Sequence, residues 1–570
     1  MIKKRLQNIF LLSHTYSSIV PARGDTKKFM RSGMLLSLIM IIGMSSCRQG
    51  SSDNELKIFR YNEAAGISSL DPAFARDLAN IWACNQLFDG LVSLDEQLDV
   101  QPSVAEDWKI SPDGKIYTFY LRKDVFFHDH MVFEEGKGRR VDAYDFEFSF
   151  RRILNPKLAS PGFWVFNNVA DDGFKALNDT VFQITLKHAF TPFLGLLTMQ
   201  YCNVVPKEAV NTYGRDFRKN PVGCGPFQFQ YWKEGVKLVF RKNPEYFLSD
   251  ENGMSLPYLD AVAITFLIDK QSAFLQFMQG KLDFMSGIDA SYKDELLTRE
   301  GGLNPAYADR INLISEPYLN TEYLGIMIDT TAGISGSNPL TNRLVRQAIS
   351  YGFDRKKMMR YLRNNIGIPG NAGIIPAGMP GHGGDRSYGY HYNPEMAAEL
   401  LSKAGYPGGA GIPPITLTTS AEYLDLVKYI QHELMQTGFE MDITVSPPAA
   451  IKELKAQAKL PFFRASWIAD YPDAENYLSL FYSGNFCPEG PNYTRFSNPA
   501  FDALYERSLQ IVDHKQRYRL YQSMDSIIMQ EAPVIILFYD EVLRFTGKNI
   551  AGLGSNPVNQ LDLTKVIKNN

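Results

Sequence analysis

Alternating hydrophobic and polar positions recur along much of the chain, and they predict strands that are separated by turns. Residues 115–122 (KIYTFYLR), 180–187 (TVFQITLK) and 236–241 (VKLVFR) alternate between two faces, as half-buried strands do. Residues 323–328 (YLGIMI) and 534–539 (VIILFY) are continuous apolar runs, which are typical of strands buried on both faces. Both kinds of strand indicate sheets with large covered surfaces.

Helical periodicity and capping residues occur between these strands. Residues 142–153 begin with a capping aspartate. Residues 393–405 and 498–509 each begin with the pair Asn-Pro, in which asparagine caps the helix and proline fits its first turn. Residues 344–362 are predicted to form one helix. Strands and helices therefore alternate over most of the chain, which predicts an α/β protein with several sheets.

The stretch from Phe462 to Phe481 contains a strand that stops abruptly. Residues 462–468 (FFRASWI) are mostly apolar and aromatic, and residues 469–473 (ADYPD) carry the proline and aspartates of a tight turn. This arrangement places Trp467 and Asp470 at the mouth of a strand, where a carboxylate and an aromatic ring can face a ligand. The alternative is a core tryptophan beside an aspartate that caps the turn, and these residues alone leave both interpretations open.

The composition of the chain limits the kinds of molecule that it is expected to bind. The 570 residues carry a net charge of −3, so the chain is long enough for several globular domains and has no basic excess for binding nucleic acid. Its five cysteines show no pairing or histidine spacing that is typical of a zinc site. Cys202 and Cys224 can form a disulfide if the fold brings them together, and free buried thiols are the alternative.

The N-terminal region resembles a bacterial lipoprotein signal. Residues 34–44 (MLLSLIMIIGM) are apolar, follow basic residues, and precede small residues and Cys47. This run is too short to span the roughly 30 Å hydrocarbon core as a helix. We predict a signal region over residues 1–46 with its true start at Met30, cleavage before Cys47, and a lipid-attached linker over residues 47–52. The lipid on that cysteine is expected to tether the mature chain to a membrane.

Motifs for catalysis and metal binding are absent from the sequence. His128-Asp129-His130 invites a metal-site interpretation, but no HExxH motif occurs, and we predict a solvated turn there. No GxSxG nucleophile motif is present, and residues 221–227 (PVGCGPF) lack the GK[ST] ending of a phosphate loop. The sequence therefore predicts no catalytic residue, no metal ligand, no cofactor and no enzyme activity.

Short blocks of sequence, in a fixed order over about residues 56–565, resemble the extracytoplasmic solute-binding proteins of the peptide/nickel ABC transporter family, which include the dipeptide- and oligopeptide-binding lipoproteins. The blocks are residues 69–72 (SLDP), 87–91 (LFDGL), 105–108 (AEDW), 117–122 (YTFYLR), 221–227 (PVGCGPF), 243–247 (NPEYF), 345–349 (VRQAI) and 404–407 (AGYP). Cys224 stands where that family usually has threonine. Since many blocks match in order, the resemblance is specific.

The resemblance implies a two-lobed, periplasmic-binding-protein-like α/β fold with an additional inserted domain and a hinge between the lobes. The chain is expected to cross the hinge near Pro317-Tyr318 and near Glu531-Ala532. The implied divisions are domain I, residues 53–94, 206–318 and 533–570; domain II, the insertion, residues 95–205; and domain III, residues 319–532.

The implied function is capture of peptides between the lobes by a monomeric, lipid-anchored periplasmic protein of a Gram-negative-type bacterium, with delivery to the permease and ATPase complex of an ABC importer. In the oligopeptide-binding relatives, an aspartate three residues after a tryptophan holds the peptide's α-ammonium. Asp470 is therefore implied as the ammonium acceptor and Trp467 as a pocket wall, and Tyr471 and Tyr323 are further predicted ligand contacts. Ile468 stands where those relatives carry a disulfide-bonded cysteine, so the pocket is expected to differ.

Three other functions stay open on the sequence. The same fold can bind a nickel chelate, haem, a sugar or a muropeptide, in which case Asp470 is structural. A lipid-anchored hydrolase is the enzyme alternative, and the missing nucleophile and metal motifs argue against it. A sensor that hands its ligand to a signalling receptor cannot be separated from an uptake protein by sequence.

Overall fold

The computed structural model describes residues 56–289, 292–329, 338–382 and 388–569. The predicted signal region and Cys47 lie outside these described residues. Within the described ranges, no helix is both long enough and apolar enough to cross a membrane.

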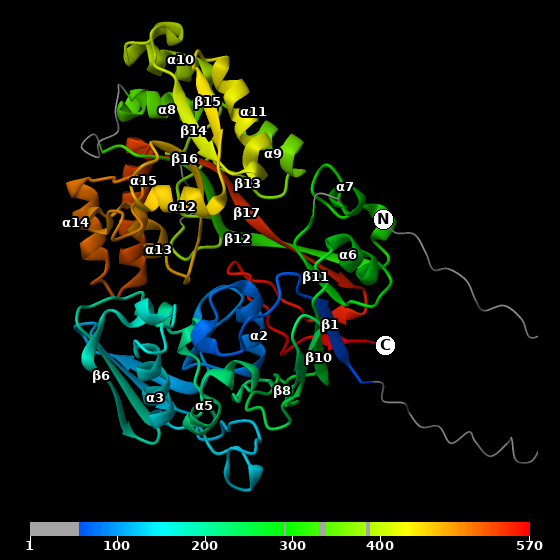
Figure 1. Cartoon of the computed structure of the whole chain (residues 1–570). Helices are drawn as coiled ribbons and strands as arrows, with labels where there is room; N and C mark the ends of the chain where they lie inside the picture. Colours follow the sequence, from blue (N-terminus) through cyan, green and yellow to red (C-terminus); the bar gives the residue numbers. More distant parts are fainter. Residues whose placement is uncertain (1–55, 290–291, 330–337, 383–387, 570) are drawn as a thin grey trace, which may run out of the picture. The chain divides into compact units, whose positions relative to one another are not determined.

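An 11-stranded mixed sheet runs through the described part of the chain (Figure 1). In spatial order its strands are β15 (Met441–Val445), β14 (Ile415–Thr419), β16 (Phe462–Ile468), β12 (Ile311–Ile326), β17 (Val534–Gly547), β11 (Phe284–Ser286), β1 (Ile58–Asn62), β10 (Ala261–Thr265), β9 (Lys237–Lys242) and β8 (Phe227–Lys233), and β13 (Ile368–Pro369) pairs with β17. β12 and β17 are the two long antiparallel strands at its centre (Figure 1).

The register of the pairing between β12 and β17 shifts at two places. The smaller shift lies between Glu322 and Tyr323, and the larger lies between Pro317 and Thr321, opposite Asp540. On one side of this shift β12 pairs with β16, and on the other side β17 pairs with β11. The larger shift lies close to Pro317-Tyr318, and the hinge crossings predicted there and near Glu531-Ala532 stay predictions. The domain boundaries themselves stay a prediction.

A separate four-stranded antiparallel sheet forms within residues 95–205. Its order is β4 (Ala105–Ile110), β5 (Ile116–Leu121), β7 (Val181–Leu186) and β6 (Val169–Asn178). β5 and β7 alternate buried and partly exposed residues along their lengths, which confirms the alternation predicted from sequence. Two small pairs complete the sheets: β2 (Val92–Leu94) with β3 (Val100–Pro102), and β18 (Ile550–Ala551) with β19 (Ile567–Lys568).

Helices connect and cover the strands. They are α2 (Leu78–Leu87), α3 (Ala143–Ile153), α4 (Phe193–Leu196), α5 (Lys207–Tyr213), α6 (Lys270–Met278), α7 (Lys293–Leu296), α8 (Arg343–Tyr351), α9 (Arg355–Arg363), α10 (Pro394–Lys403), α11 (Leu424–Met435), α12 (Pro448–Ala456), α13 (Glu475–Leu478), α14 (Pro499–Ser508) and α15 (His514–Glu531). The prediction of one helix over residues 344–362 is wrong. Asp354 accepts hydrogen bonds from the backbone of Lys356 and Lys357, and it thereby caps a second helix.

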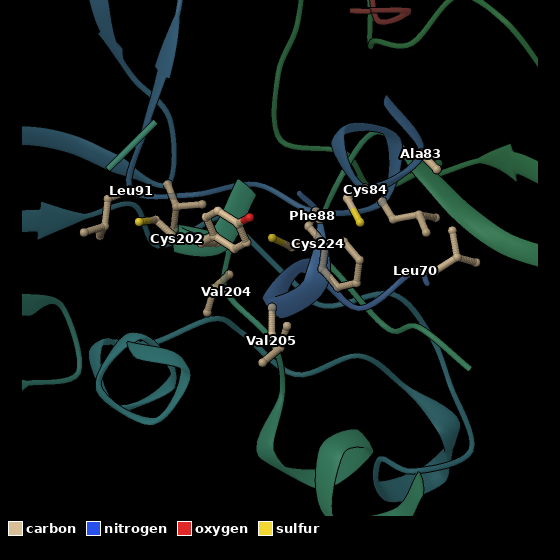
Figure 2. Close-up of a cluster of buried hydrophobic side chains, with 14 of the residues drawn as sticks. Leu70, Ala83, Cys84, Phe88, Leu91, Cys202, Val204, Val205 and Cys224 are labelled. Carbon is tan, nitrogen blue, oxygen red and sulfur yellow. The ribbon is translucent and has the colours of Figure 1, made fainter. Parts of the chain in front are cut away.

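Three cysteines lie in the largest apolar cluster of the described residues. Figure 2 shows Cys84, Cys202 and Cys224 among buried side chains that include Phe88 and Val204. The four cysteines in the described ranges are free thiols, so Cys202 and Cys224 are not bonded to each other. Burial raises the pKa of each thiol in this cluster, which keeps it protonated and unreactive at neutral pH.

His128 is a buried residue, so the prediction of a solvated turn at this position is wrong. Its Nδ1 accepts a hydrogen bond from the backbone of Gly223 at 3.3 Å, and its Nε2 donates to the carbonyl of Gly225 at 3.0 Å. Burial lowers the pKa of His128 to about 4. The imidazole is therefore neutral and holds the Gly-Pro loop in place. No group of residues in the described ranges is arranged to hold a metal ion.

Candidate functional site

One edge of β16 is open for part of its length. β16 pairs with β12 along all of its residues, but on its other side it meets β14 through the pair Phe463 and Thr418. From Arg464 to Ile468 this edge has no strand partner among the described residues. The backbone donors and acceptors of such an edge can pair with an extended chain, whatever its side chains are.

A tight turn follows this open edge and is held by one buried amide. The side-chain oxygen of Asn476 accepts a hydrogen bond from Trp467 Nε1 at 2.7 Å and another from the backbone N–H of Asp470 at 3.2 Å. The backbone N–H of Ala469 donates to the carbonyl of Leu319 on β12 at 2.9 Å. The structure therefore brings Trp467 and Asp470 together at the end of the strand, where the sequence placed them.

The carboxylate of Asp470 is the exposed charge of this turn. No lysine or arginine in the described ranges forms an ion pair with it, and the side chain of Asn476 is its hydrogen-bond partner. Partial burial by the surrounding protein raises the pKa of Asp470, and the Asn476 hydrogen bond lowers it by a smaller amount. An acid in this position is free to pair with a cationic group that arrives with a ligand.

Aromatic residues from the range 95–205 lie near this turn. Burial raises the pKa of Tyr201 to about 12, and the nearby negative charge of Asp470 is the second cause. The rings of Trp164 and Tyr471 lie 6.4 Å apart between their centroids. The ring contact joins residues 95–205 to the 469–473 turn, and the effect of Asp470 on Tyr201 indicates that the two side chains are near each other. The space above Asp470 is therefore bordered by aromatic residues from two parts of the chain.

A buried polar network supports the turn from below. Tyr471 and Tyr505 both donate hydrogen bonds to the carboxyl group of Glu475. Burial raises the pKa of Glu475 to about 7. Asp473 accepts hydrogen bonds from Arg517 at 2.8 Å and from the hydroxyl of Tyr521 at 2.7 Å. These bonds hold the backbone that carries Asp470, since linked buried hydrogen bonds resist displacement of the groups that they join.

Four predicted ligand contacts occupy different environments. Asp470 is exposed and Trp467 is partly buried, so both are accessible from the open edge. Tyr471 is buried, with its hydroxyl committed to Glu475, and Tyr323 is buried in the core between β16 and β17. Contact of these two tyrosines with a ligand stays a prediction. Asn476 was not predicted from the sequence. Its position six residues after Asp470 was the one available signal.

A cavity of about 760 Å³ lies on the part of the 11-stranded sheet that does not contain β16. It lies at the carboxyl ends of β1 and β11, and its lining includes Asn62, Glu63, Asp77 and Ser286. Ligands of open α/β sheets bind at such strand ends.

Comparison with known proteins gives one family and a consistent fold. The sequence profile described as bacterial extracellular solute-binding proteins, family 5 Middle, matches residues 99–486. The glutathione-binding protein GsiB of Salmonella paratyphi A is 26% identical over 500 residues, which cover 86% of this chain and 91% of that protein.

Two solved structures share the fold. HbpA2 from Haemophilus parasuis superposes with a TM-score of 0.78 at 23% identity, over 90% of this chain and 100% of that one. The ABC transporter-associated periplasmic binding protein DppA from Helicobacter pylori, solved with the peptide STSA, has a TM-score of 0.69 at 24% identity, over 90% and 98%. The predicted α/β, two-lobed periplasmic-binding-protein-like fold is confirmed by these likenesses.

Proposed function

Because the chain belongs to family 5 of the bacterial extracellular solute-binding proteins, we propose that it captures a short peptide between its lobes and delivers it to the permease and ATPase complex of an ABC importer. The peptide's backbone would pair with the open edge of β16 from Arg464 to Ile468. Its α-ammonium would pair with Asp470, and Trp467 would form one wall of a side-chain pocket.

The observation that carries this proposal is an exposed, unpaired carboxylate directly beyond an open strand edge. A strand edge binds peptide backbone without selecting side chains, and one charge at its end fixes the register. Side chains that lie in loose pockets can be accommodated by bridging water. This combination suits a protein that accepts many short peptides rather than one.

The relative GsiB supports a peptide-like ligand. It is named as a glutathione-binding protein, and glutathione is a tripeptide with one free α-ammonium. A binding protein also fits this site better than a hydrolase does, because the residues around Asp470 form no nucleophile and base pair. Closure of the lobes needs only that the closed form bind the ligand more tightly than the open form.

We further propose that a lipid on Cys47 tethers the mature chain to the periplasmic face of a membrane. The support is the sequence alone: an apolar run, small residues and a cysteine, followed by a short polar linker. A tether keeps the protein near an importer in the same membrane. Mass spectrometry of the mature N-terminus would identify the modified residue.

The test of peptide binding uses residues 48–570, produced without the lipid and purified without added ligand. The described part of this span forms one compact unit. Denaturing the protein and identifying the released molecules by mass spectrometry should give short peptides with free amino ends. A single non-peptide species, such as a nickel chelate or a muropeptide, would contradict the role given to Asp470. If nothing is released, a thermal-shift screen follows, since a ligand of the folded state raises the melting temperature.

A further inference from the structure

A groove with a volume of about 1270 Å³ lies where residues 68–76 meet α3, α5 and the segments that follow these two helices (Figure 1). Its lining contains no residue of β16 or of the 469–476 turn, so the groove and the proposed peptide site share no residue. Sites for whole small molecules occupy roughly 300–1,000 Å³. The groove is therefore large enough for a segment of polypeptide.

Cationic side chains dominate the lining of this groove. Its two carboxylates are Asp71 and Asp216, and its six cations are Arg76, Arg151, Arg152, Lys157, Arg215 and Arg218. The net charge of the whole chain is −3, so the basic lining does not follow from composition. Five of the six cations are arginines, and the planar guanidinium of arginine can hold a carboxylate through two parallel hydrogen bonds.

Half of these cations have no carboxylate partner in the described part of the chain. Arg152 pairs with Asp71, whose side chain is buried. Arg151 and Arg218 each pair with acids outside the lining. The other three cations are exposed and form no ion pair with a described residue; they are Arg76, Lys157 and Arg215. Asp216 is the one lining carboxylate left to offset them, so the groove keeps an excess of positive charge.

Apolar side chains form the base of the groove. These side chains are half-buried and pack against the largest apolar cluster of the described residues; they belong to Phe74, Phe148, Leu158 and Val210. The hydroxyl of Ser160 donates a hydrogen bond to the carbonyl of Ala73 at 2.6 Å. The backbone N–H of Leu70 donates to the carbonyl of Arg218 at 3.0 Å. Because these bonds join three of the segments that border the groove, its shape is already formed without a partner.

We propose that this groove is an interaction surface for a partner protein and that it binds an acidic, partly apolar segment of that partner. Opposite charges across an interface speed association and exclude wrong partners. Arginine and aromatic side chains are enriched where protein interfaces bind most strongly. A small inorganic anion would leave the apolar base of the groove uncovered, whereas a segment that carries both acidic and apolar side chains satisfies both parts of the lining.

The test measures binding of a synthetic peptide to the lipid-free chain, residues 48–570, by fluorescence anisotropy. The peptide has glutamates interspersed with leucines and a fluorophore at its C-terminus, and its acetylated N-terminus has no α-ammonium for Asp470. We expect a Kd of roughly 10–100 µM, as for a weak protein interface. Raising the salt from about 50 mM to about 200 mM should weaken binding about fivefold, because salt screens exposed charges. The same peptide with glutamine in place of glutamate should not bind.

A triple variant locates the binding site by removing the unpaired cations of the groove: Arg76→Gln, Lys157→Gln and Arg215→Gln. Its Kd should rise about tenfold, since each exposed ion pair contributes a few-fold to affinity. A matched control removes two arginines and one lysine that are exposed elsewhere and form no ion pair with a described residue: Arg360→Gln, Arg519→Gln and Lys428→Gln. The control has the same net charge as the groove variant and should bind the peptide as the wild type does.

The remaining outcomes overturn the inference. An unchanged Kd in the groove variant would place the peptide elsewhere, and equal weakening in both variants would mean that only the overall charge attracts it. Equal binding of a peptide with serine in place of leucine would reduce the groove to a site for anions. Binding of phosphatidylglycerol vesicles that the groove variant loses, with no binding of the peptide, would make this surface a membrane contact. None of these results touches the proposed capture of peptides, because the variants change no residue of the candidate site.

Discussion

Two polar clusters in this protein use buried hydrogen bonds in opposite ways. In the 469–476 turn, Asn476 and Glu475 hold a backbone whose carboxylate, Asp470, stays exposed and without an ion-pair partner. In the 221–227 loop, His128 and Asn243 turn inward, and both donate to the carbonyl of Gly225. Both clusters fall in sequence blocks that carry the family resemblance or adjoin them. An exposed carboxylate without an ion-pair partner is what distinguishes the proposed binding turn from the structural loop.

The largest expected effect is on peptide binding by Asp470→Ala. Closure of the lobes would desolvate the pair formed by this carboxylate and the ligand's ammonium, so its loss should cost about 2–5 kcal/mol. That is roughly a thirtyfold to several thousandfold increase in Kd, measurable by titration calorimetry. Asp442→Ala, an exposed aspartate on β15, is the matched control and should leave Kd unchanged. Equal affinity of the Asp470 variant and the wild type would remove Asp470 from the site.

The opposite behaviour is expected at His128. His128→Ala leaves the N–H of Gly223 and the carbonyl of Gly225 without their buried partner, which should cost about 2–4 kcal/mol of unfolding free energy. Peptide affinity of the folded fraction should stay at the wild-type value. His188→Ala removes an exposed histidine and should change the unfolding free energy by less than about 0.5 kcal/mol. Urea unfolding of both variants measures these changes. Equal losses of unfolding free energy in the two variants would mean that His128 has no structural role.

Each cluster also contains or adjoins a buried acid, and this gives a prediction on pH. Burial raises the pKa of Glu475 from 4.5 to about 7, and that of Asp89, near Cys224, from 3.8 to about 7. A raised pKa means that the folded state holds a proton that the unfolded state has released. The resulting stability is complete below the unfolded pKa and is lost as the pH rises through about 7.

The amide side chains of Glu475→Gln and Asp89→Asn cannot ionise. The unfolding free energy of each variant should therefore fall less than that of the wild type as the pH rises. Relative to either variant, the wild type should lose roughly 3 kcal/mol of unfolding free energy between about pH 5 and about pH 8. Urea unfolding at both pH values measures the difference. Parallel pH profiles of variant and wild type would show that the acid in question is already ionised in the folded protein.

Local patterns predicted much of the fold, because they depend on neighbours in sequence. The alternation in β5 and β7 and the helix that begins after Asp142 needed no distant information. β12 was predicted only over its apolar end, residues 323–328, whereas the strand begins at Ile311. Its first half is partly exposed and includes Pro317, so hydrophobicity gave no signal there. Pairing with β17, more than 200 residues away, is what extends it.

The candidate site also contains some residues that local sequence predicts and others that only folding brings together. Trp467 and Asp470 were predicted because the strand and the turn adjoin in sequence. The supports of the turn come from elsewhere: Tyr505 and Arg517 lie on later helices and reach Glu475 and Asp473 only in the folded protein. Sequence spacing cannot reveal such pairs, since hydrogen bonding and desolvation between distant segments create them.

The smallest effect, and the sharpest test of how the turn is held, is expected for Asn476→Ala. This change removes the acceptor shared by Trp467 Nε1 and the backbone of Asp470, but water can reach both donors near the open edge. We expect peptide binding to weaken by about 1 kcal/mol, or about fivefold in Kd. Ser479→Ala removes a hydrogen bond to the backbone of Asn476 without touching its side chain, and it should leave Kd unchanged. If Asn476→Ala weakened binding as much as Asp470→Ala, the carboxylate would depend on its support for nearly all of its effect. If it changed nothing, the turn would hold Asp470 through the Glu475 network alone.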